Sequence, residues 1–261
     1  MKNKIIIVPD VHCRDFYKPV LNIKDKPVIF LGDYMDPYWD EGTTDEQGIE
    51  NLKEIFEFAR NNKNVTLLCG NHDCSWIWSH LGWERTHFEF YNELHKLYRD
   101  NIDLLKPCLK VNNVLFTHAG VNKGWLDAVQ YFLEENGSSL KLTQNNIDIY
   151  IGNEFQKELV NDHAFGSLWS PYLSSNIFWI GRCRGGDSSY GGPFWSDFDY
   201  DYSDPIDWNI KQIFSHTQRW KTGSIGQKEN GYCIDSRAIF EYDFDKEELS
   251  LWEGENSEEK K

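Results

Sequence analysis

Short apolar runs recur along the chain, and each is followed by glycine or polar residues. They span residues 5–8, 28–31, 65–69, 114–117 and 213–215. Runs of this length that are rich in Val and Ile and bounded by turn residues are typical of buried strands. The pattern therefore predicts a sheet-based domain whose strands are separated by longer connections.

Helical periodicity occupies several of those connections. Residues 43–46 combine a capping Thr pair with early acidic residues, as at the start of a helix. Apolar positions then follow with helical spacing at Ile49, Leu52, Ile55, Phe56 and Ala59. Residues 75–100 predict one or two amphipathic helices, and residues 122–160 predict two helical pieces broken near residues 137–139. Residues 1–121 thus indicate a β-α-β alternation and the α/β class.

The C-terminal half differs in composition and in the periodicity of its apolar residues. Residues 163–205 are rich in glycine and aromatic residues without a clean period, which favours an ordered functional loop. A strand pair is expected at residues 231–234 and 237–242, and a last strand at residues 249–252. Because no linker interrupts the chain, we predict one domain over residues 1–252, followed by a frayed acidic and lysine tail at 253–261.

Composition and charge limit the partners. Hydrophobic residues make up 40% of the 261 residues, which is ample for a core, and no apolar stretch approaches the ~18 residues that span a bilayer. A net charge of −15 argues against stable nucleic-acid binding and against an anionic membrane. It does not argue against a phosphate-bearing substrate, because bound divalent ions can reverse the sign of a site.

The six cysteines form no C-x-x-C pair, and residues 5–8 are expected to form a first strand rather than part of a signal peptide. Reduced thiols in a chain of this size favour a cytoplasmic location.

The residues that follow the apolar runs are ones that bind metals or transfer protons. Asp10 and His12 follow the first run, Asp33 and Asp36 the second, Asn71 and His72 the third, and His118 and His216 the last two. In open α/β sheets a ligand site lies just outside the carboxyl ends of the strands. We therefore expect these side chains to converge on one rim, where they would supply the ligands of a two-metal hydrolytic centre.

Each motif taken alone has a plainer interpretation. Asp-x-His after a strand can be a cap and a core histidine, and Gly-Asp can be only a turn. Asp73 is expected to cap the helix that follows Asn71 and His72, and His80, His87 and His95 are expected to be packing or surface residues. The ordered occurrence of all the motifs, each at a strand end, favours the functional interpretation.

The same order of motifs resembles the calcineurin-like metallophosphoesterases, over residues 1–121 and 206–243. It is most similar to the branch of the serine/threonine protein phosphatases and bis(nucleosyl)-tetraphosphatases, whose G-D-x-x-D motif is matched by residues 32–36. The resemblance implies a central β-sandwich of two mixed sheets flanked by helices. It implies that Asp10 and His12 bind a first metal, that Asp33 bridges both metals, that Asn71, His118 and His216 bind the second, and that His72 is a general acid oriented by Asp36.

The ligand types indicate the metal and the reaction. Mixed carboxylate, imidazole and amide ligands suit two divalent ions, with Mn²⁺ expected first and Fe or Zn²⁺ as alternatives. The predicted reaction is hydrolysis of a phosphomonoester by metal-activated hydroxide, with a serine/threonine phosphoprotein as one candidate substrate. The alternative is a dinucleoside polyphosphate or another nucleotide. A non-catalytic scaffold of the same fold would be expected to lack a ligand or the acid, and all are present.

One expected residue is missing. The arginine that follows G-D-x-x-D in the protein phosphatases, and binds phosphate there, is replaced by Pro37. Residues 194–197 resemble the Trp-Ser-Asp stretch of that branch, where an arginine lies upstream, so Arg182 or Arg184 is expected to bind phosphate. Arg14 is a further candidate. A guanidinium suits this role because it is planar and can donate two parallel hydrogen bonds, although a surface position remains open for each of the three.

Overall fold

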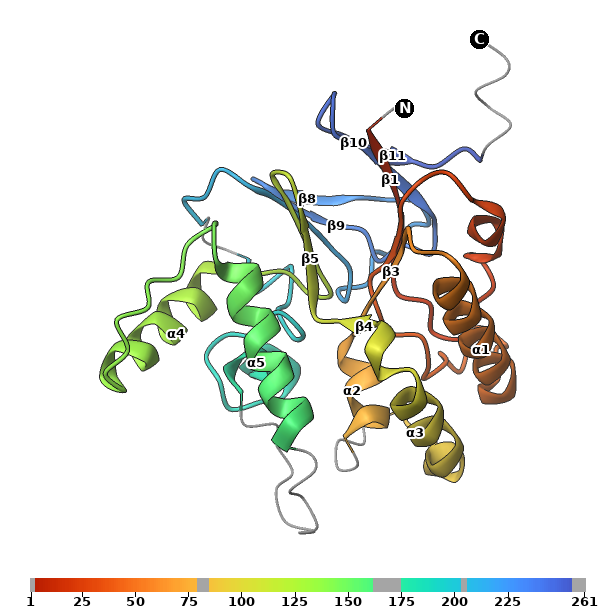
Figure 1. Ribbon diagram of the computed structural model, residues 1–261, viewed down its shortest axis with the longest axis horizontal. Helices are drawn as coiled ribbons and strands as arrows, with labels where there is room; N and C mark the ends of the chain where they lie inside the picture. The colour runs from red at the N-terminus through yellow and green to blue at the C-terminus, as the bar shows by residue number, and fades with distance from the viewer. Residues whose placement is uncertain (1–2, 79–84, 162–174, 203–205, 255–261) are drawn as a thin grey trace.

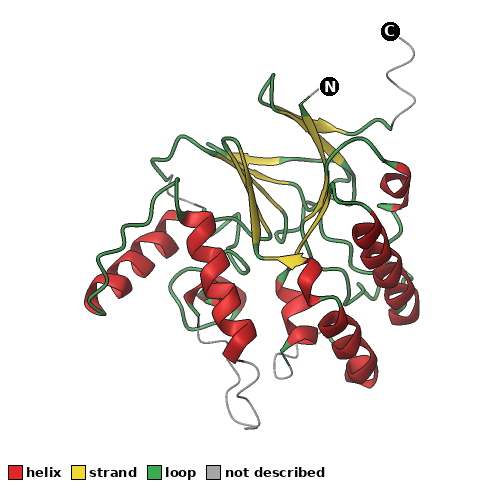
Figure 2. Ribbon diagram, viewed as in Figure 1, coloured by secondary structure: helices red, strands yellow, loops and turns green. Residues whose placement is uncertain are grey.

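The computed structural model describes residues 3–78, 85–161, 175–202 and 206–254. Its strands form two sheets, with helices on their outer faces (Figures 1 and 2). The strands are β1 Lys4–Val8, β2 Val28–Phe30, β3 Val65–Leu68, β4 Leu105–Lys106, β5 Cys108–Val111, β6 Val114–Thr117, β7 Lys211–Phe214, β8 Gly226–Lys228, β9 Gly231–Cys233, β10 Phe240–Asp243 and β11 Glu248–Leu251. The apolar runs of the sequence correspond to β1, β2, β3, β6 and β7.

Both sheets are mixed. The first has the order β11-β10-β1-β2-β3-β4, in which β1 to β4 are parallel to one another and β10 is antiparallel to both of its neighbours, β1 and β11. The second has the order β5-β6-β7-β9-β8, with β6, β7 and β9 parallel and the outer strands antiparallel. The predicted arrangement of two mixed sheets flanked by helices is confirmed.

Successive side chains of β1 point alternately to the two faces of its sheet, and both faces are buried. Ile5 and Ile7 of β1 belong to a buried cluster that also contains Phe116 of β6, so these residues face the opposite sheet. Ile6 and Val8, which point the other way, belong to the larger cluster that the helices cover. Because successive side chains of a strand point to opposite faces, a fully apolar strand is expected where both faces are buried.

The helices divide between the two sheets. They are α1 Asp45–Asn61, α2 Asn71–Ile77, α3 Tyr91–Asp100, α4 Lys123–Glu135 and α5 Ile147–Asn161, with short 3₁₀ helices η1 Lys18–Asn22, η2 Phe88–Phe90, η3 Ile102–Leu104, η5 Asn176–Phe178 and η6 Arg182–Arg184. Figure 1 shows α1, α2 and α3 beside the first sheet, and α4 and α5 beside the second. Thr44 caps α1 as predicted, since its side chain accepts a hydrogen bond from Gln47 N at 3.2 Å.

One predicted pairing is wrong. The segments around residues 231–234 and 237–242 are strands, but they lie in different sheets: β9 pairs with β7 and β8, whereas β10 pairs with β1 and β11. The short connection between them crosses from one sheet to the other rather than forming a hairpin. Local turn signals could not reveal this, because the choice of partner depends on which sheet offers an open edge.

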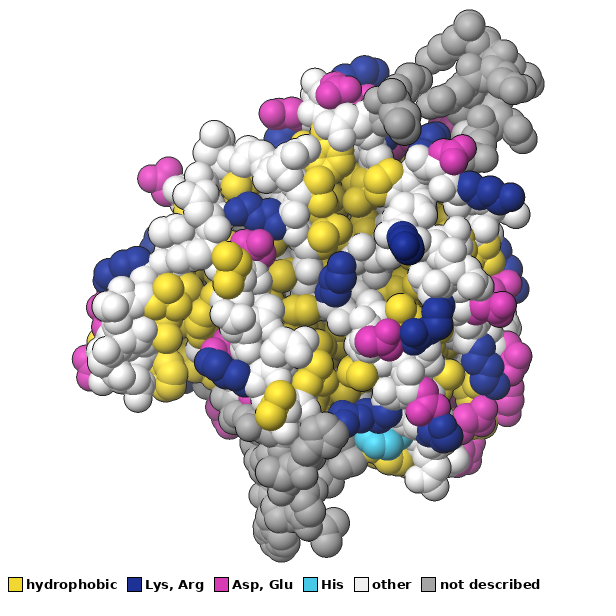
Figure 3. Space-filling model, viewed as in Figure 1, with side chains coloured by type: hydrophobic (Ala, Val, Ile, Leu, Met, Phe, Trp, Pro, Cys, Tyr) yellow, Lys and Arg dark blue, Asp and Glu magenta, His cyan; other side chains and the backbone are white. Residues whose placement is uncertain are grey.

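The visible surface carries mixed charge. On the face shown in Figure 3, basic side chains are scattered among acidic ones and do not form a continuous stripe. Among the described helices, none is long and apolar enough to cross a membrane.

Candidate metal centre

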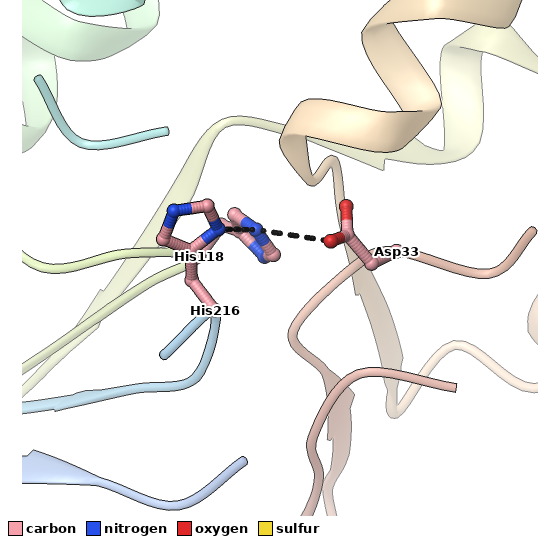
Figure 4. A group of neighbouring side chains, drawn as sticks. All are labelled: Asp33, His118 and His216. Carbon is pink, nitrogen blue, oxygen red and sulfur yellow. Dashed lines mark hydrogen bonds and ion pairs between the residues drawn. The ribbon is translucent and has the colours of Figure 1, made fainter. Parts of the chain in front are cut away.

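The polar side chains that follow five strands meet at one end of the sandwich. Asp10 lies beyond β1, Asp33 beyond β2 and Asn71 beyond β3, while His118 and His216 follow β6 and β7 in the second sheet. Figure 4 shows Asp33 facing His118 and His216 across the gap between the two sheets. The predicted convergence on one rim is therefore present in the structure.

Two glycines permit this close approach. A Cβ atom on Gly32 would lie 2.4 Å from Gly70 N, and one on Gly70 would lie 2.1 Å from Asp33 Oδ1. Any side chain at either position would push apart the turns that follow β2 and β3. The glycines thereby bring Asp33 beside the start of α2, where Asn71 lies.

The ligand atoms fall into two groups that share Asp33. Asp10, His12 and Asp33 form one group, and Asp33, His118 and His216 form the other, with the potential ligand atoms of each group within 4.8 Å of one another. Asn71 joins the second group, because its Oδ1 lies 2.8 Å from His118 Nε2. This division, with one shared carboxylate, is the one that the resemblance implied.

Backbone carbonyls fix which imidazole nitrogen faces the site. His12 Nδ1 lies 2.9 Å from Met35 O, and His118 Nδ1 lies 2.9 Å from Leu31 O, so each Nδ1 must carry the proton and donate. The Nε2 lone pairs then point inward. Such an outer hydrogen bond on the far nitrogen is the usual support of a metal-binding histidine.

His118 Nε2 then has no proton to share with the oxygen atoms of Asn71 and Asp33 that face it. His118 Nε2 lies 3.1 Å from His216 Nδ1 and 3.4 Å from Asp33 Oδ2, while His216 Nε2 is buried and has no hydrogen-bond partner among the described residues. Lone pairs and carboxylate oxygens that face one another repel unless a cation lies between them. These residues therefore fit a divalent metal.

The electrostatics agree with that assignment. Burial raises the pKa of Asp10 and of Asp33 to about 7 each. It lowers the pKa of His118, and it lowers those of His12 and His216 well below the usual value. The imidazoles are therefore neutral, as metal-binding imidazoles must be, and the buried carboxyls need a nearby cation to be fully ionised at neutral pH.

His72 lies beside these ligands and has a different environment. Its Nδ1 lies 2.6 Å from Asp36 Oδ2, and its ring centroid lies 5.2 Å from that of His12. Burial alone would lower the pKa of His72, but the carboxylates of Asp33 and Asp36 raise it above the usual value. A histidine that holds its proton next to a hydrolytic site suits a general acid.

The turns that carry these side chains have unusual backbones. His12, Asp33, Asp36 and His216 all have positive φ, between 43° and 66°, as does Cys13. Such left-handed conformations are costly for residues other than glycine and gather at functional sites. Glycine would fit these turns with less strain but would provide no ligand.

Sequence reasoning missed contacts of two residues, Asp73 and Ser215, that support the candidate ligands. Asp73 caps α2 as predicted, since its Oδ2 accepts from Gly70 N at 2.7 Å, but it also accepts from the backbone N–H groups of Asp33 and Tyr34 and from the Tyr98 hydroxyl. Ser215 donates a hydrogen bond to Asp10 Oδ1. Both contacts join segments far apart in sequence, which local spacing cannot reveal.

The other histidines follow their plainer interpretation. His87 is exposed and its Nδ1 lies 2.5 Å from Asp45 Oδ2, while His95 Nδ1 lies 2.8 Å from Trp76 O on the neighbouring helix. His80 lies outside the described residues.

The three candidate phosphate-binding arginines have different surroundings. Arg14 is buried and directs its guanidinium to Glu41. Arg184 lies 2.7 Å from Asp197 Oδ2 and donates to Thr217 Oγ1, and Arg182 is exposed. A fourth arginine, Arg85, was not predicted; its Nη2 lies 3.2 Å from His72 Nε2.

The comparisons with known proteins identify the family. The family model of calcineurin-like phosphoesterases matches residues 3–219. This chain belongs to the calcineurin-like phosphoesterase family. The resemblance drawn from the strand-end motifs is confirmed.

The match to a curated relative covers a smaller part of the chain. The chain is 28% identical over 138 residues to Shewanella-like protein phosphatase 1 of Plasmodium berghei (strain Anka), a match that covers 46% of this chain and 36% of the relative. The matched part thus spans about a third of that protein's length.

Solved structures share the fold. A cold-active protein-tyrosine phosphatase of a psychrophile Shewanella sp. matches with a TM-score of 0.56 and 16% identity, covering 94% of this chain and 76% of that one. A further structure of a cold-active protein tyrosine phosphatase matches with a TM-score of 0.54 and 15% identity, covering 93% and 74%. At this identity the likeness concerns the fold.

Proposed function

We propose that this calcineurin-like phosphoesterase is a dinuclear-metal phosphatase that hydrolyses phosphomonoesters. The observation that carries the proposal is the pair of ligand groups that share Asp33, in which His118 Nε2 directs its lone pair at Asn71 Oδ1 and Asp33 Oδ2. Asp10 and His12 would hold one ion and Asn71, His118 and His216 the other. Mn²⁺ suits these mixed ligands, and Fe or Zn²⁺ are alternatives.

Two such ions would supply an activated water and neutralise the charge of the phosphoryl oxygens. The chain's own residues would handle the leaving group. Asp36 accepts a hydrogen bond from His72 Nδ1, which leaves His72 Nε2 to donate its proton to the departing alkoxide. Ser215 and Asp73 would keep Asp10 and Asp33 in place through the contacts described above.

The relatives' names favour a phosphorylated protein as the substrate, since the curated relative is called a protein phosphatase and a solved structure a protein-tyrosine phosphatase. Phosphoserine, phosphothreonine and phosphotyrosine peptides are therefore the first substrates to test. A nucleotide or a dinucleoside polyphosphate is the alternative for the same centre.

The test is a turnover panel of the three phosphopeptides, nucleotides, dinucleoside polyphosphates and phosphodiesters, each with Mn²⁺, Zn²⁺ or Mg²⁺. We expect monoester hydrolysis by the protein loaded with two ions, and loss of both activity and the second ion in Asp33→Asn. Preferential cleavage of anhydrides or diesters would contradict the monoester proposal. An Asp33→Asn variant that retained two metals and near-normal turnover would contradict the bridging role.

A further inference from the structure

We propose that Arg85 binds the substrate phosphoryl group and fills the place left by Pro37. The inference rests on the proposed phosphatase function, because it assigns a substrate contact to the same centre. Arg85 lies 48 positions after Pro37, in a stretch whose sequence carries no motif.

The guanidinium lies beside the peptide group that precedes the side chain of position 37. Arg85 Nη1 donates to the carbonyl oxygen of Asp36 at 2.7 Å, and that carbonyl belongs to the peptide group that joins Asp36 to Pro37. An arginine at position 37 would have started from this peptide. Arg85 instead reaches it from the segment that follows α2.

Its position relative to His72 places it within reach of the substrate. A general acid must come within about 3 Å of the leaving-group oxygen, which is bonded to the phosphorus. Arg85 Nη2 is 3.2 Å from His72 Nε2, the atom that would give the proton. A phosphoryl group positioned for protonation by His72 therefore arrives within hydrogen-bond reach of Arg85.

The arginine is also held in place. Its Cζ lies 3.7 Å from the centre of the Tyr38 ring, and that ring stands edge-on to His12 at a centroid distance of 5.0 Å. The next residue, Thr86, donates to Asp36 Oδ2 at 3.2 Å. Stacking on an aromatic ring fixes the guanidinium plane, so less conformational freedom is lost when phosphate binds.

Its charge is available for an anion. Arg14 and Arg237 both contact Glu41, and Arg184 contacts Asp197. Within the described residues, Arg85 forms no ion pair with a carboxylate; its contacts are a carbonyl oxygen, an imidazole nitrogen and a ring. A guanidinium has five N–H donors, and the carbonyl oxygen of Asp36 accepts only one of them, so Arg85 retains donors for phosphoryl oxygens.

The experiment measures orthophosphate binding by calorimetry to the metal-loaded protein, with metal content and circular dichroism checked for each variant. Arg85→Ala should weaken orthophosphate binding roughly 10- to 100-fold at unchanged metal content, the loss expected for a charged hydrogen bond. The orthophosphate affinity of Arg85→Lys should lie between those of the wild type and Arg85→Ala, because an ammonium cannot donate two parallel hydrogen bonds to two oxygens. This variant also provides the test if Arg85→Ala folds poorly. Arg60→Ala, an exposed arginine paired with Asp103, is the matched control and should bind as the wild type does.

The outcomes separate the two proposals. If Arg85→Ala and Arg85→Lys bind orthophosphate within about twofold of a wild type that is active, Arg85 is not the phosphate residue and the phosphatase proposal stands. Slower turnover with unchanged orthophosphate binding would likewise overturn it, since Arg85 would then only position His72. If the metal-loaded wild type neither binds orthophosphate nor hydrolyses any ester, both proposals fail.

Discussion

Histidines in one small site differ in role because their neighbours differ. His12 and His118 each donate one ring proton to a backbone carbonyl, which turns the other nitrogen inward as a candidate ligand. His72 instead donates to a carboxylate, and its pKa is raised where those of the others are lowered. Under the proposed function, the same side chain would thereby serve as a neutral ligand at two positions and as an acid at a third.

Replacement of His72 by Asn should expose the acid role. An alkyl phosphate such as a phosphoserine peptide should be hydrolysed roughly 10²- to 10⁴-fold more slowly, because its alkoxide needs a proton as it leaves. An aryl phosphate with an acidic phenol should lose far less. Steady-state rates on the two ester types, at matched metal content, check this; an equal loss on both would mean that His72 acts mainly by holding its neighbour Asn71.

At the scale of elements, the start of α2 is tied to the turn after β2. The carboxylate of Asp73, in the first turn of α2, accepts from Asp33 N, Tyr34 N and Gly70 N, and from the hydroxyl of Tyr98 on α3. One side chain thus joins two helices and two strand-end turns, and keeps Asp33 and Asn71 together.

Replacement of Asp73 by Asn should weaken this junction. The amide presents an N–H₂ group to donors that need an acceptor, so the free energy of unfolding should fall by about 1–3 kcal/mol, the range for buried groups left without partners. Urea unfolding measures the change, and metal titration should show weaker binding in parallel. Asp127→Asn, an exposed acid that contacts Lys123 on α4, should change neither quantity measurably. Equal stability of Asp73→Asn and wild type would contradict the role.

The division between what the sequence predicts and what it does not follows the range of the interactions. The strands, the α1 cap and the positions of Asp10, Asp33 and His118 depend on local patterns, so they could be predicted. The sheet that accepts β10, the contact from Tyr98 to Asp73 and the place of Arg85 depend on segments brought together only by folding. No spacing rule in the sequence encodes those contacts. The single domain, the cytoplasmic location and the roles of Arg14, Arg182 and Arg184 stay predictions.

At the scale of the molecule, the candidate centre joins the two sheets. Asp10, Asp33 and Asn71 follow strands of the first sheet, whereas His118 and His216 follow strands of the second. Ions held between them would act as cross-links at one end of the sandwich, where buried carboxylates would otherwise repel each other. The acidic chain, with a net charge of −15, would gain further from the added positive charge.

Removal of the metals should therefore lower thermal stability. A ligand that binds only the folded state, present at 100 times its dissociation constant, adds about 2.7 kcal/mol to the free energy of unfolding. We expect a chelator to lower the melting temperature and Mn²⁺ to restore it, as followed by differential scanning calorimetry. Asp33→Asn should respond much less. A melting temperature that is unaffected by chelator in a protein shown to contain two ions would contradict the cross-linking role.

The left-handed turns have a consequence for attempts to improve this protein by mutation. At His216, with φ of 66° and a buried Nε2 that has no hydrogen-bond partner among the described residues, glycine or asparagine would relax the backbone and remove a poorly solvated nitrogen. A library screened only for heat resistance without metal would thus enrich substitutions that erase the centre. At position 216, selection for thermal stability without metal and selection for catalytic turnover would therefore favour different residues.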